Sequence, residues 1–274
     1  MDRKVCLLAG YDKYNIIQDY VVFLVQELSK ISDVYYFADS NMSEKELSKI
    51  RDYTKYAESL QHGGKYFGSW QYLMHYIGWQ TLEKYDEMII CNDSIYGPMT
   101  NIEDIFDYME LRNYDFWGLT ENYHSTYHLD SYFMVFNQNI IKHCKFQEFW
   151  KSITPGVVSK NYETLLTPFL TEIGFVGNSY IKNYRKEDQL AYPLHLLKYN
   201  KMPFIRVKSL KNPEINLREP IWYMDTKIKN KTGYNTDMIH RHLSSVGEFR
   251  GFGINYYFKN MLDSIKTKVE NLLS

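Results

Sequence analysis

The sequence predicts an α/β fold built on a mostly parallel β-sheet that is flanked by helices. Short, nearly continuous apolar runs alternate along the chain with segments whose apolar residues recur at helical spacing. Continuous apolar runs are typical of parallel strands, which are buried on both faces, and their alternation with helices favours βα units. With 274 residues, the chain fits one large domain, or one domain with a helical appendage.

The N-terminal part of this pattern contains two strands and two helices. Lys4–Ala9 is an apolar run that predicts a buried strand, and apolar residues then recur at helical spacing over residues 16–28. Val34–Ala38 predicts a second buried strand. Ser43 and Glu46 form a capping box, which predicts that the next helix begins there.

The middle of the chain continues the alternation. Gly174 is a natural C-cap for the helix that precedes it. We expect the sheet domain to span residues 1–210. Its remaining elements are, in order, helix Phe67–Lys84, strand Met88–Cys91, helix Ile102–Leu111, strands Asp115–Leu119 and His128–Asn137, helices Gln138–Ser152, Tyr162–Ile173 and Glu187–Tyr199, and strand Pro203–Val207.

The segment after Leu210 differs in character, and we expect residues 211–274 to form a C-terminal helical extension packed on the sheet domain. Its last helix, expected at Tyr256–Leu273, has an apolar face, while its lysines lie elsewhere. This amphipathic pattern leaves two interpretations open: a helix packed on the sheet domain, or a peripheral contact with a membrane surface.

Composition and charge exclude several classes of protein. The net charge is −1 with both signs scattered along the chain, so no basic stripe suggests a nucleic-acid partner. The three cysteines, Cys6, Cys91 and Cys144, are far apart and predict reduced thiols, not a disulfide framework or a metal cluster. The first apolar run is too brief for a signal peptide, and no run reaches membrane-spanning length, so we expect a cytoplasmic protein.

Two of the predicted strands end in an aspartate, Asp39 and Asp93. Ligands of open α/β sheets gather outside the carboxyl ends of the strands. A carboxylate at Asp93 could hold Mg²⁺ or Mn²⁺ beside a diphosphate, and one at Asp39 could accept hydrogen bonds from a nucleobase or a ribose. The alternative is that both residues only cap the turns that follow the strands.

Six stretches, taken together and in this order, resemble the nucleotide-sugar half of GT-A-type glycosyltransferases. More narrowly, they are similar to the rhamnan synthesis protein F family, bacterial proteins of cell-wall and O-antigen polysaccharide assembly. The resemblance covers most of the chain up to about residue 208 and implies a GT-A-like fold. The stretches are KYFGSW (65–70), EMIICNDSIYGPM (87–99), YDFWGLTEN (114–122), HLDSYFMVF (128–136), YETLLTPFLTEIGF (162–175) and YPLHLLKYNKMPFIRVK (192–208).

The resemblance implies a donor site in which Asp39 contacts the nucleobase and Asp93 meets the metal and the diphosphate. Asn92 stands where many GT-A enzymes have the first acid of an Asp-X-Asp motif, so catalysis without a metal stays open. His62 and Tyr66 stand where the family has an Asn and an Asp; His62 is either a sugar or phosphate ligand or an exposed loop residue. The implied donor-binding residues are Asp39, Asn92, Asp93, Ser94, Lys65 and His62, with Asp93 as the metal ligand.

Glycosyl transfer also needs a base that takes the proton from the attacking acceptor hydroxyl. Glu163 is our first candidate because it opens a helix whose spacing resembles the base-bearing segment of inverting GT-A enzymes. Glu121 is the second candidate and Asp130 the third. A glutamate in the first turn of a helix is also ordinary dipole compensation, and that alternative stays open.

The function implied by the resemblance is transfer of a sugar from a dTDP- or UDP-sugar onto a bacterial surface polysaccharide or lipid-linked glycan. The expected case is L-rhamnose from dTDP-rhamnose, with inversion at the anomeric carbon. The expected location is the cytoplasm, either free or peripheral at the inner face of the cell membrane. Two rivals are a retaining glycosyltransferase of the same fold and a catalytically silent GT-A-like module that binds glycan or partner proteins.

Overall fold

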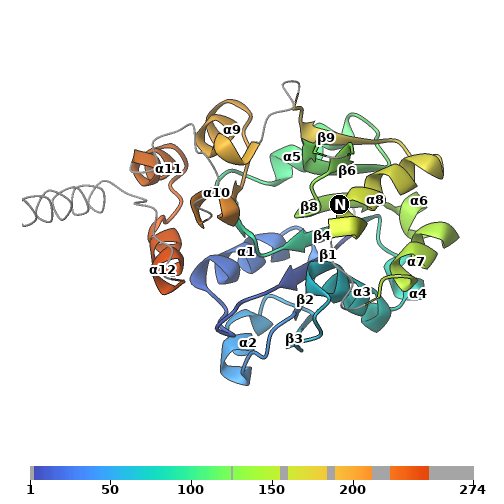
Figure 1. The fold of residues 1–274 in the computed structure, drawn as a ribbon, viewed down its shortest axis with the longest axis horizontal. Coiled ribbons are helices and arrows are strands. Elements are labelled where there is room, and N and C mark those ends of the chain that lie inside the picture. The colour runs from blue at the N-terminus through green and yellow to red at the C-terminus, as the bar shows by residue number, and fades with distance from the viewer. Residues whose placement is uncertain (1–2, 125, 155–159, 184–188, 212–222, 247–274) are drawn as a thin grey trace, which may run out of the picture. The chain divides into compact units, whose positions relative to one another are not determined.

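The computed structural model describes residues 3–124, 126–154, 160–183, 189–211 and 223–246 (Figure 1). It contains two compact units, one formed by Met1–Ile95 and Asn101–Glu187 and the other by Tyr96–Thr100 and Asp188–Ser274. All of the predicted site residues belong to the first unit.

The first unit is built on an eight-stranded sheet with the order β3-β2-β1-β4-β8-β6-β7, in which β9 also pairs with β6. The four strands from β3 to β4 are parallel, β8 runs antiparallel to both of its neighbours, and β9 is parallel to β6. The expected α/β fold with a mostly parallel sheet is therefore confirmed. The strands are β1 (Lys4–Gly10), β2 (Asp33–Ala38), β3 (Tyr56–Ser59), β4 (Glu87–Asn92), β6 (Phe116–Asn122), β7 (His128–Leu129), β8 (Phe133–Asn137) and β9 (Gly177–Ile181).

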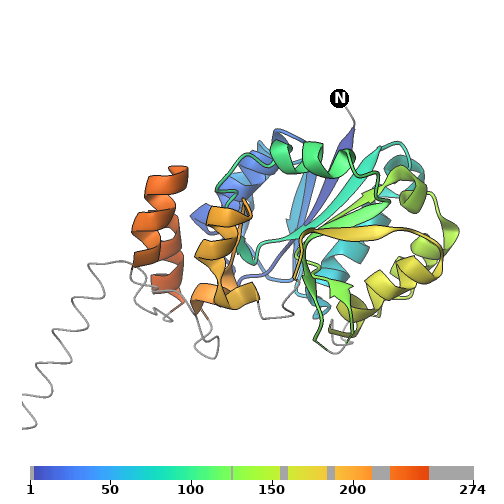
Figure 2. The ribbon, with the colours of Figure 1, turned by 90° about the horizontal axis from the view of Figure 1, so that it is seen from above.

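Helices flank this sheet, as Figure 2 shows. On one face, Leu7 of β1 and Ile90 of β4 share a buried cluster with residues of α3, α7 and α8. On the other face, Phe106 of α5 packs edge-on against Trp117 of β6. The helices of this unit are α1 (Asp19–Ser29), α2 (Glu44–Arg51), α3 (Lys65–Ile77), α4 (Trp79–Leu82), α5 (Glu103–Glu110), α6 (Gln138–Ile141), α7 (Cys144–Lys151) and α8 (Lys160–Glu172).

The second unit is mainly helical in its described part. Its segment 96–100 is tied to a later one by the N–H of Met99, which donates to the carbonyl of Pro203 at 2.7 Å. Strands β5 (Ile95–Tyr96) and β10 (Ile205–Arg206) pair in a two-stranded sheet. The helices are the short 3₁₀ turn η1 (Gln189–Ala191), α9 (Pro193–Tyr199), α10 (Val207–Lys211), α11 (Met224–Thr232) and α12 (Asp237–Ser245).

Several predicted boundaries differ from the observed ones for local reasons. Gly78 has a left-handed φ of 78° and divides the helix predicted over 67–84 into α3 and α4. The strand predicted over 128–137 is interrupted between β7 and β8. Strands β3 and β9 were not predicted, because their sequences, YAES and GNSYI, are short and largely polar.

The helix expected at 256–273 lies outside the described residues. Within the part of the chain that the structure describes, every helix is too short or too polar to cross a membrane.

Candidate functional site

Asp39 and Asp93 follow the two strands that flank β1, at the edge of the sheet where these parallel strands end. The register pairs Gly10 with Ala38 on one side of β1 and Ala9 with Asn92 on the other. The N–H of Asp39 continues one ladder to the carbonyl of Gly10 (3.0 Å), and the N–H of Asp93 continues the other to Ala9 (3.1 Å). Two strand spacings, about 10 Å, therefore separate the two backbone positions.

The carboxylate of Asp39 organises the loop that leads into α3. Its Oδ1 accepts hydrogen bonds from the N–H groups of His62 (2.8 Å) and Gly63 (2.9 Å), and its Oδ2 accepts one from that of Lys65 (2.8 Å). Burial alone would raise the pKa of Asp39, but these three donors lower the pKa below its ordinary value. Both oxygens are thus engaged within the chain, while the side chain of Lys65 is exposed.

The ring of His62 packs against the first turn of α3. Its Nδ1 accepts a hydrogen bond from the N–H of Gly64 (3.0 Å), which assigns the ring proton to Nε2, and Nε2 lies 3.0 Å from Oγ of Ser69. Burial lowers the pKa of His62, although the Asp39 carboxylate opposes this shift. Both ring nitrogens already have partners, so the predicted ligand role of His62 would require these bonds to be replaced.

Asp93 is buried at the centre of this edge, with 4% of its surface exposed. Its Oδ2 accepts a hydrogen bond from the N–H of Tyr11 at 2.8 Å, and the side chain of Tyr66 also hydrogen-bonds to it. Burial, helped by the nearby carboxylate of Asp12, raises the pKa of Asp93 to about 7 in spite of these hydrogen bonds. At neutral pH the group therefore lies close to its titration midpoint, and a positive charge beside it would restore the carboxylate.

Asn92 and Ser94 shape the turn that presents Asp93. Oδ1 of Asn92 accepts hydrogen bonds from the N–H (3.1 Å) and from Oγ (2.5 Å) of Ser94, which is the pattern of an Asx turn. Asn92 is buried and Ser94 is half-buried. The side-chain oxygen that could have replaced the missing acid of the Asp-X-Asp pattern is therefore used to hold the turn.

The predicted metal site offers a divalent cation one carboxylate, that of Asp93. Among the described residues, no group of three or more His, Cys, Asp or Glu side chains could hold a metal ion. Mg²⁺ is commonly bound through one or two carboxylates together with substrate phosphates. Asp93 therefore fits a cation for which a diphosphate supplies the remaining ligands.

Glu163, the first candidate base, lies in the first turn of α8 and contacts the loop before β8. Its Oε1 accepts hydrogen bonds from the N–H (3.0 Å) and Oγ (2.8 Å) of Ser131. The next residue, Tyr132, accepts at its carbonyl a hydrogen bond from the N–H of Asn92 (3.1 Å). Loop 131–132 thus links Glu163 to the edge that carries Asp93, and Oε2 of Glu163 accepts no hydrogen bond from the described residues.

Asp130, the third candidate, is half-buried in the same loop. Its Oδ2 lies 2.6 Å from Oγ1 of Thr120, and its Oδ1 lies 3.5 Å from Nδ2 of Asn122. Oδ1 of Asp130 is therefore held less tightly than Oδ2.

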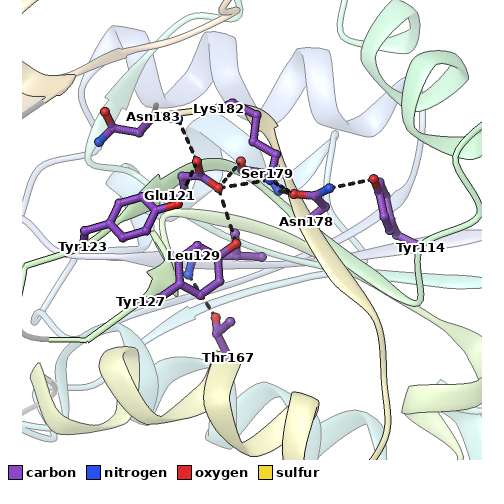
Figure 3. A network of polar contacts seen from close by, with 10 residues as sticks. All are labelled: Tyr114, Glu121, Tyr123, Tyr127, Leu129, Thr167, Asn178, Ser179, Lys182 and Asn183. Atoms are coloured by element: carbon purple, nitrogen blue, oxygen red, sulfur yellow. Dashed lines mark hydrogen bonds and ion pairs between the residues drawn. The ribbon is translucent and has the colours of Figure 1, made fainter. Parts of the chain in front are cut away.

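Glu121, the second candidate, is only 3% exposed and lies at the centre of a polar network (Figure 3). Its Oε1 accepts a hydrogen bond from the N–H of Asn183 (2.7 Å), and its Oε2 accepts one from Oγ of Ser179 (2.7 Å). Nζ of Lys182 lies 3.3 Å from Oε2, and this lysine also hydrogen-bonds to the side chain of Asn178. A carboxylate with this many donors is less accessible to a substrate hydroxyl than that of Glu163.

The sequence did not identify Tyr11, Tyr66 and Ser131 as parts of the site. For Tyr66 a signal existed, because it stands at a position where the chain departs from the pattern it resembles. Tyr11 contributes through its backbone N–H, which any residue type carries, so the sequence holds no signal for it. Ser131 contributes its hydroxyl as well as its N–H, but no sequence pattern pairs it with Glu163, which is 32 residues away.

A cavity of about 430 Å³ also lies in the first unit, along α3. The aromatic residues Phe37, Tyr72 and Trp150 line it together with His62. Neither acid belongs to this lining, although His62, whose N–H donates to Asp39, does.

Three solved structures are similar to this chain at low identity. The glycosyltransferase GlyE of Streptococcus pneumoniae TIGR4 is 11% identical with a TM-score of 0.48, and the match covers 90% of this chain and 64% of GlyE. A cytidylyltransferase from Leptospira borgpetersenii serovar Hardjo-bovis is 12% identical with a TM-score of 0.40 (81% and 100% covered). A glycosyltransferase involved in the glycosylation of the major capsid of PBCV-1 is 11% identical with a TM-score of 0.44 (74% and 94% covered).

Assignment to a family comes from the sequence, because all three TM-scores lie below 0.5. No curated protein matches this chain. The family model described as rhamnan synthesis protein F matches residues 34–272, which is most of the chain. The protein therefore belongs to the rhamnan synthesis protein F family.

Proposed function

We propose that the protein is a glycosyltransferase that moves a sugar from a nucleotide-diphosphate donor onto a bacterial surface polysaccharide or a lipid-linked glycan. Membership of the rhamnan synthesis protein F family supports a role in polysaccharide synthesis. The observation that carries the proposal is the link between Asp93 and Glu163 through loop 131–132. This link supports a donor-side acid and a base candidate that serve one site.

The chemistry needs a base for the acceptor hydroxyl and stabilisation of the departing diphosphate. We assign the base to Glu163, because Ser131 holds one of its oxygens and would aim the other at the acceptor. Direct attack by that hydroxyl on the anomeric carbon, with loss of the nucleotide diphosphate from the opposite side, inverts the configuration. The family description, rhamnan synthesis, supports L-rhamnose as the sugar, and we propose its dTDP-activated form as the donor.

Asp93 would lie beside the diphosphate, and Asp39 would act on the donor through the loop that it holds. A divalent cation that arrives with the donor would neutralise phosphate charge and keep Asp93 ionised. Among the similar solved structures, core-mannan synthase A of Aspergillus fumigatus is a Mn/GDP form. For this chain, Mg²⁺ or Mn²⁺ dependence stays a proposal.

We further propose that residues 1–210 form the transferase domain and residues 211–274 a helical extension, with the enzyme acting on the cytoplasmic side of the membrane. Helices α11 and α12 belong to that extension.

The test is thermal unfolding of the purified protein with UDP, dTDP or GDP, each with and without Mn²⁺, followed by NMR of the product formed from the preferred donor. A nucleotide at 100 times its dissociation constant stabilises the folded state by about 2.7 kcal/mol, which is readily measured as a rise in Tm. A β-configured donor should give an α-configured product, and retained configuration would identify the retaining mechanism. Absence of stabilisation by all three nucleotides contradicts the proposal.

A second candidate function is a glycan-binding module without catalysis. The observation in its favour is that both oxygens of Asp39 and the side-chain oxygen of Asn92 are already engaged within the chain. Such a module should bind saccharides and show no stabilisation by nucleotides.

A further inference from the structure

Tyr123 and Tyr127 present two exposed rings at the end of β6, on the loop that joins it to β7. Their side chains are 36% and 38% exposed, and their ring centroids are 5.3 Å apart with planes inclined by 53°. The N–H of His124 donates to Oδ1 of Asn122 (2.8 Å), which fixes the start of this loop. The rings are therefore held in place while much of their surface faces solvent.

Both hydroxyl groups point at the buried carboxylate of Glu121 (Figure 3). The hydroxyl oxygen of Tyr123 lies 3.5 Å from Oε1, and that of Tyr127 lies 3.4 Å from Oε2. Burial and the charge of Glu121 raise the pKa of Tyr127, so its hydroxyl stays protonated and acts as a donor. Asn183 and Ser179 hold Glu121 from the other side, so the carboxylate that both hydroxyl groups face has a fixed position.

The chemistry of this surface suits a neutral sugar better than a phosphate. Lys182 is the cation of the network, and the carboxylate of Glu121 already neutralises it. Exposed tyrosine rings offer flat apolar faces, against which the C–H face of a pyranose packs, and their hydroxyl edges offer polar partners. A nucleotide diphosphate would instead need unpaired positive charge or converging N–H groups.

Hydrogen bonds connect the strand that precedes the rings to the loop that contacts the proposed base. The N–H of Asp130 donates to the carbonyl of Thr120 (3.0 Å), the residue before Glu121, and Ser131 then contacts Glu163. The rings and the proposed base are therefore carried by connected segments of the same unit, which suits an acceptor glycan that extends from one toward the other.

We propose that Tyr123 and Tyr127 bind a neutral sugar unit of the acceptor glycan, and that Glu121 is a positioning residue that holds the two rings. The term acceptor rests on the proposed function, whereas the binding of a neutral saccharide does not. Glu121 then serves binding through the tyrosines and takes no proton from the substrate.

The experiment is saturation-transfer NMR with an α-linked rhamnose trisaccharide, with and without dTDP, and with maltotriose as a second neutral saccharide. Tyr123→Ala and Tyr127→Ala should each weaken saccharide binding about tenfold, the scale of one aromatic contact. Tyr123→Phe and Tyr127→Phe keep the ring faces but lose the hydroxyl that faces Glu121, so each should bind more tightly than its alanine counterpart and less tightly than the wild type. Tyr53→Ala, which removes a 40% exposed tyrosine at the end of α2, is the matched control and should leave binding unchanged.

Glu121 is tested by two substitutions. Glu121→Gln keeps an acceptor oxygen and should retain more saccharide affinity than Glu121→Ala. In turnover assays, Glu121→Gln should raise the KM for the acceptor and leave kcat within about threefold, whereas loss of a base would lower kcat by about 10² or more. A collapse of kcat at unchanged acceptor KM would overturn the positioning role.

Two measurements separate this inference from the proposed function. Nucleotide stabilisation with saccharide binding that is unchanged in both alanine variants overturns the inference and leaves the transferase proposal intact. Saccharide binding that depends on the tyrosines, without nucleotide stabilisation, supports the sugar site and contradicts the transferase. If an alanine variant does not fold, ring-labelled tyrosine NMR of the wild-type protein decides, because the saccharide should shift the resonances that the phenylalanine variants lack; unshifted resonances count against the site.

Discussion

His62 and Tyr66 are two of the residues at which this chain departs from the pattern it resembles, and each contacts one of the two acids of the site. The N–H of His62 donates to Asp39, and the side chain of Tyr66 hydrogen-bonds to Asp93. Asp93 is the more unusual of the two acids, because burial raises its pKa to about 7. The burial and contacts of these individual residues therefore determine whether this edge of the sheet is charged when a ligand binds.

Asp93 should make the stability of the free protein depend on pH. Its folded-state pKa of about 7 lies above the ordinary value near 4, so the stabilising contribution of the protonated group is full below pH 4 and is lost as pH rises through 7. Relative to the Asp93→Asn variant, the wild type should lose about 2–4 kcal/mol of unfolding free energy between pH 4 and pH 8. Urea unfolding across this range measures the difference, with Asp107→Asn on the exposed face of α5 as control.

Equal pH profiles of the wild type and Asp93→Asn would show that Asp93 titrates in the ordinary range. Addition of Mn²⁺ with the preferred nucleotide should shift the wild-type profile toward lower pH, because positive charge beside the carboxylate lowers its pKa.

Asp93→Ala should abolish turnover and weaken nucleotide binding, and full activity of that variant would contradict its role.

Glu163→Gln should reduce turnover by about two to four orders of magnitude, the usual effect of losing a general base, and should leave nucleotide binding unchanged. Glutamine keeps an acceptor oxygen for Ser131, so the loop before β8 should stay in place. Steady-state kinetics on the purified variant measures this, with Glu172→Gln at the exposed end of α8 as the matched control. A near-normal rate in Glu163→Gln would transfer the role to Asp130.

At the scale of elements, the N-terminus of α3 is the segment on which the donor side of the site depends. Asp39 holds the loop that precedes α3. The ring of His62 occupies the space where a side chain at residue 68 would lie, and that residue is a glycine. A Cβ added at Gly68 would lie 2.8 Å from that ring. The close approach explains why the KYFGSW stretch has glycine at this position.

Gly68→Ala should therefore destabilise the protein by about 1–3 kcal/mol, the usual cost of overpacking. In the His62→Ala background the ring is gone, so the same Gly68→Ala change should cost less than about 0.5 kcal/mol or should stabilise, because alanine favours the helix. Chemical unfolding of the four proteins of this double-mutant cycle measures the coupling. Equal costs in both backgrounds would mean that the ring does not limit the space at Gly68.

At the scale of the whole molecule, the chain contains two compact units, and the expected site residues all fall in the first. The family match extends to residue 272 and thus includes the C-terminal stretch. In sequence, residues 256–273 combine apolar positions at helical spacing with lysines 259, 266 and 268.

Removal of residues 256–274 should reduce sedimentation of the protein with vesicles that contain about 30% anionic lipid, since each lysine near such a surface contributes about 1 kcal/mol. Nucleotide binding should be unchanged, because the donor residues lie before residue 95. The full chain with Lys259, Lys266 and Lys268 changed to Glu is the control that reverses the three positive charges and keeps the length. Equal sedimentation of all three proteins would show that this stretch packs on the protein instead of contacting lipid.

The sequence by itself determined the α/β class, the order of the long elements and the position of both aspartates at strand ends, because apolar periodicity and turn residues are local signals. It did not predict β3, β9 or the break at Gly78, where short polar strands and a single glycine conformation give weak local signals.

Only the tertiary structure decided which residues surround the two acids and how strongly each acid holds its proton. The pKa of Asp93 depends on burial and on Asp12, which is 81 residues away in the chain. The contacts of Glu163 with Ser131, and of Glu121 with Ser179 and two tyrosines, likewise join segments whose proximity no local pattern encodes. Desolvation and hydrogen bonding are properties of the assembled sheet edge, so they follow from the packing of the chain and not from its periodicity.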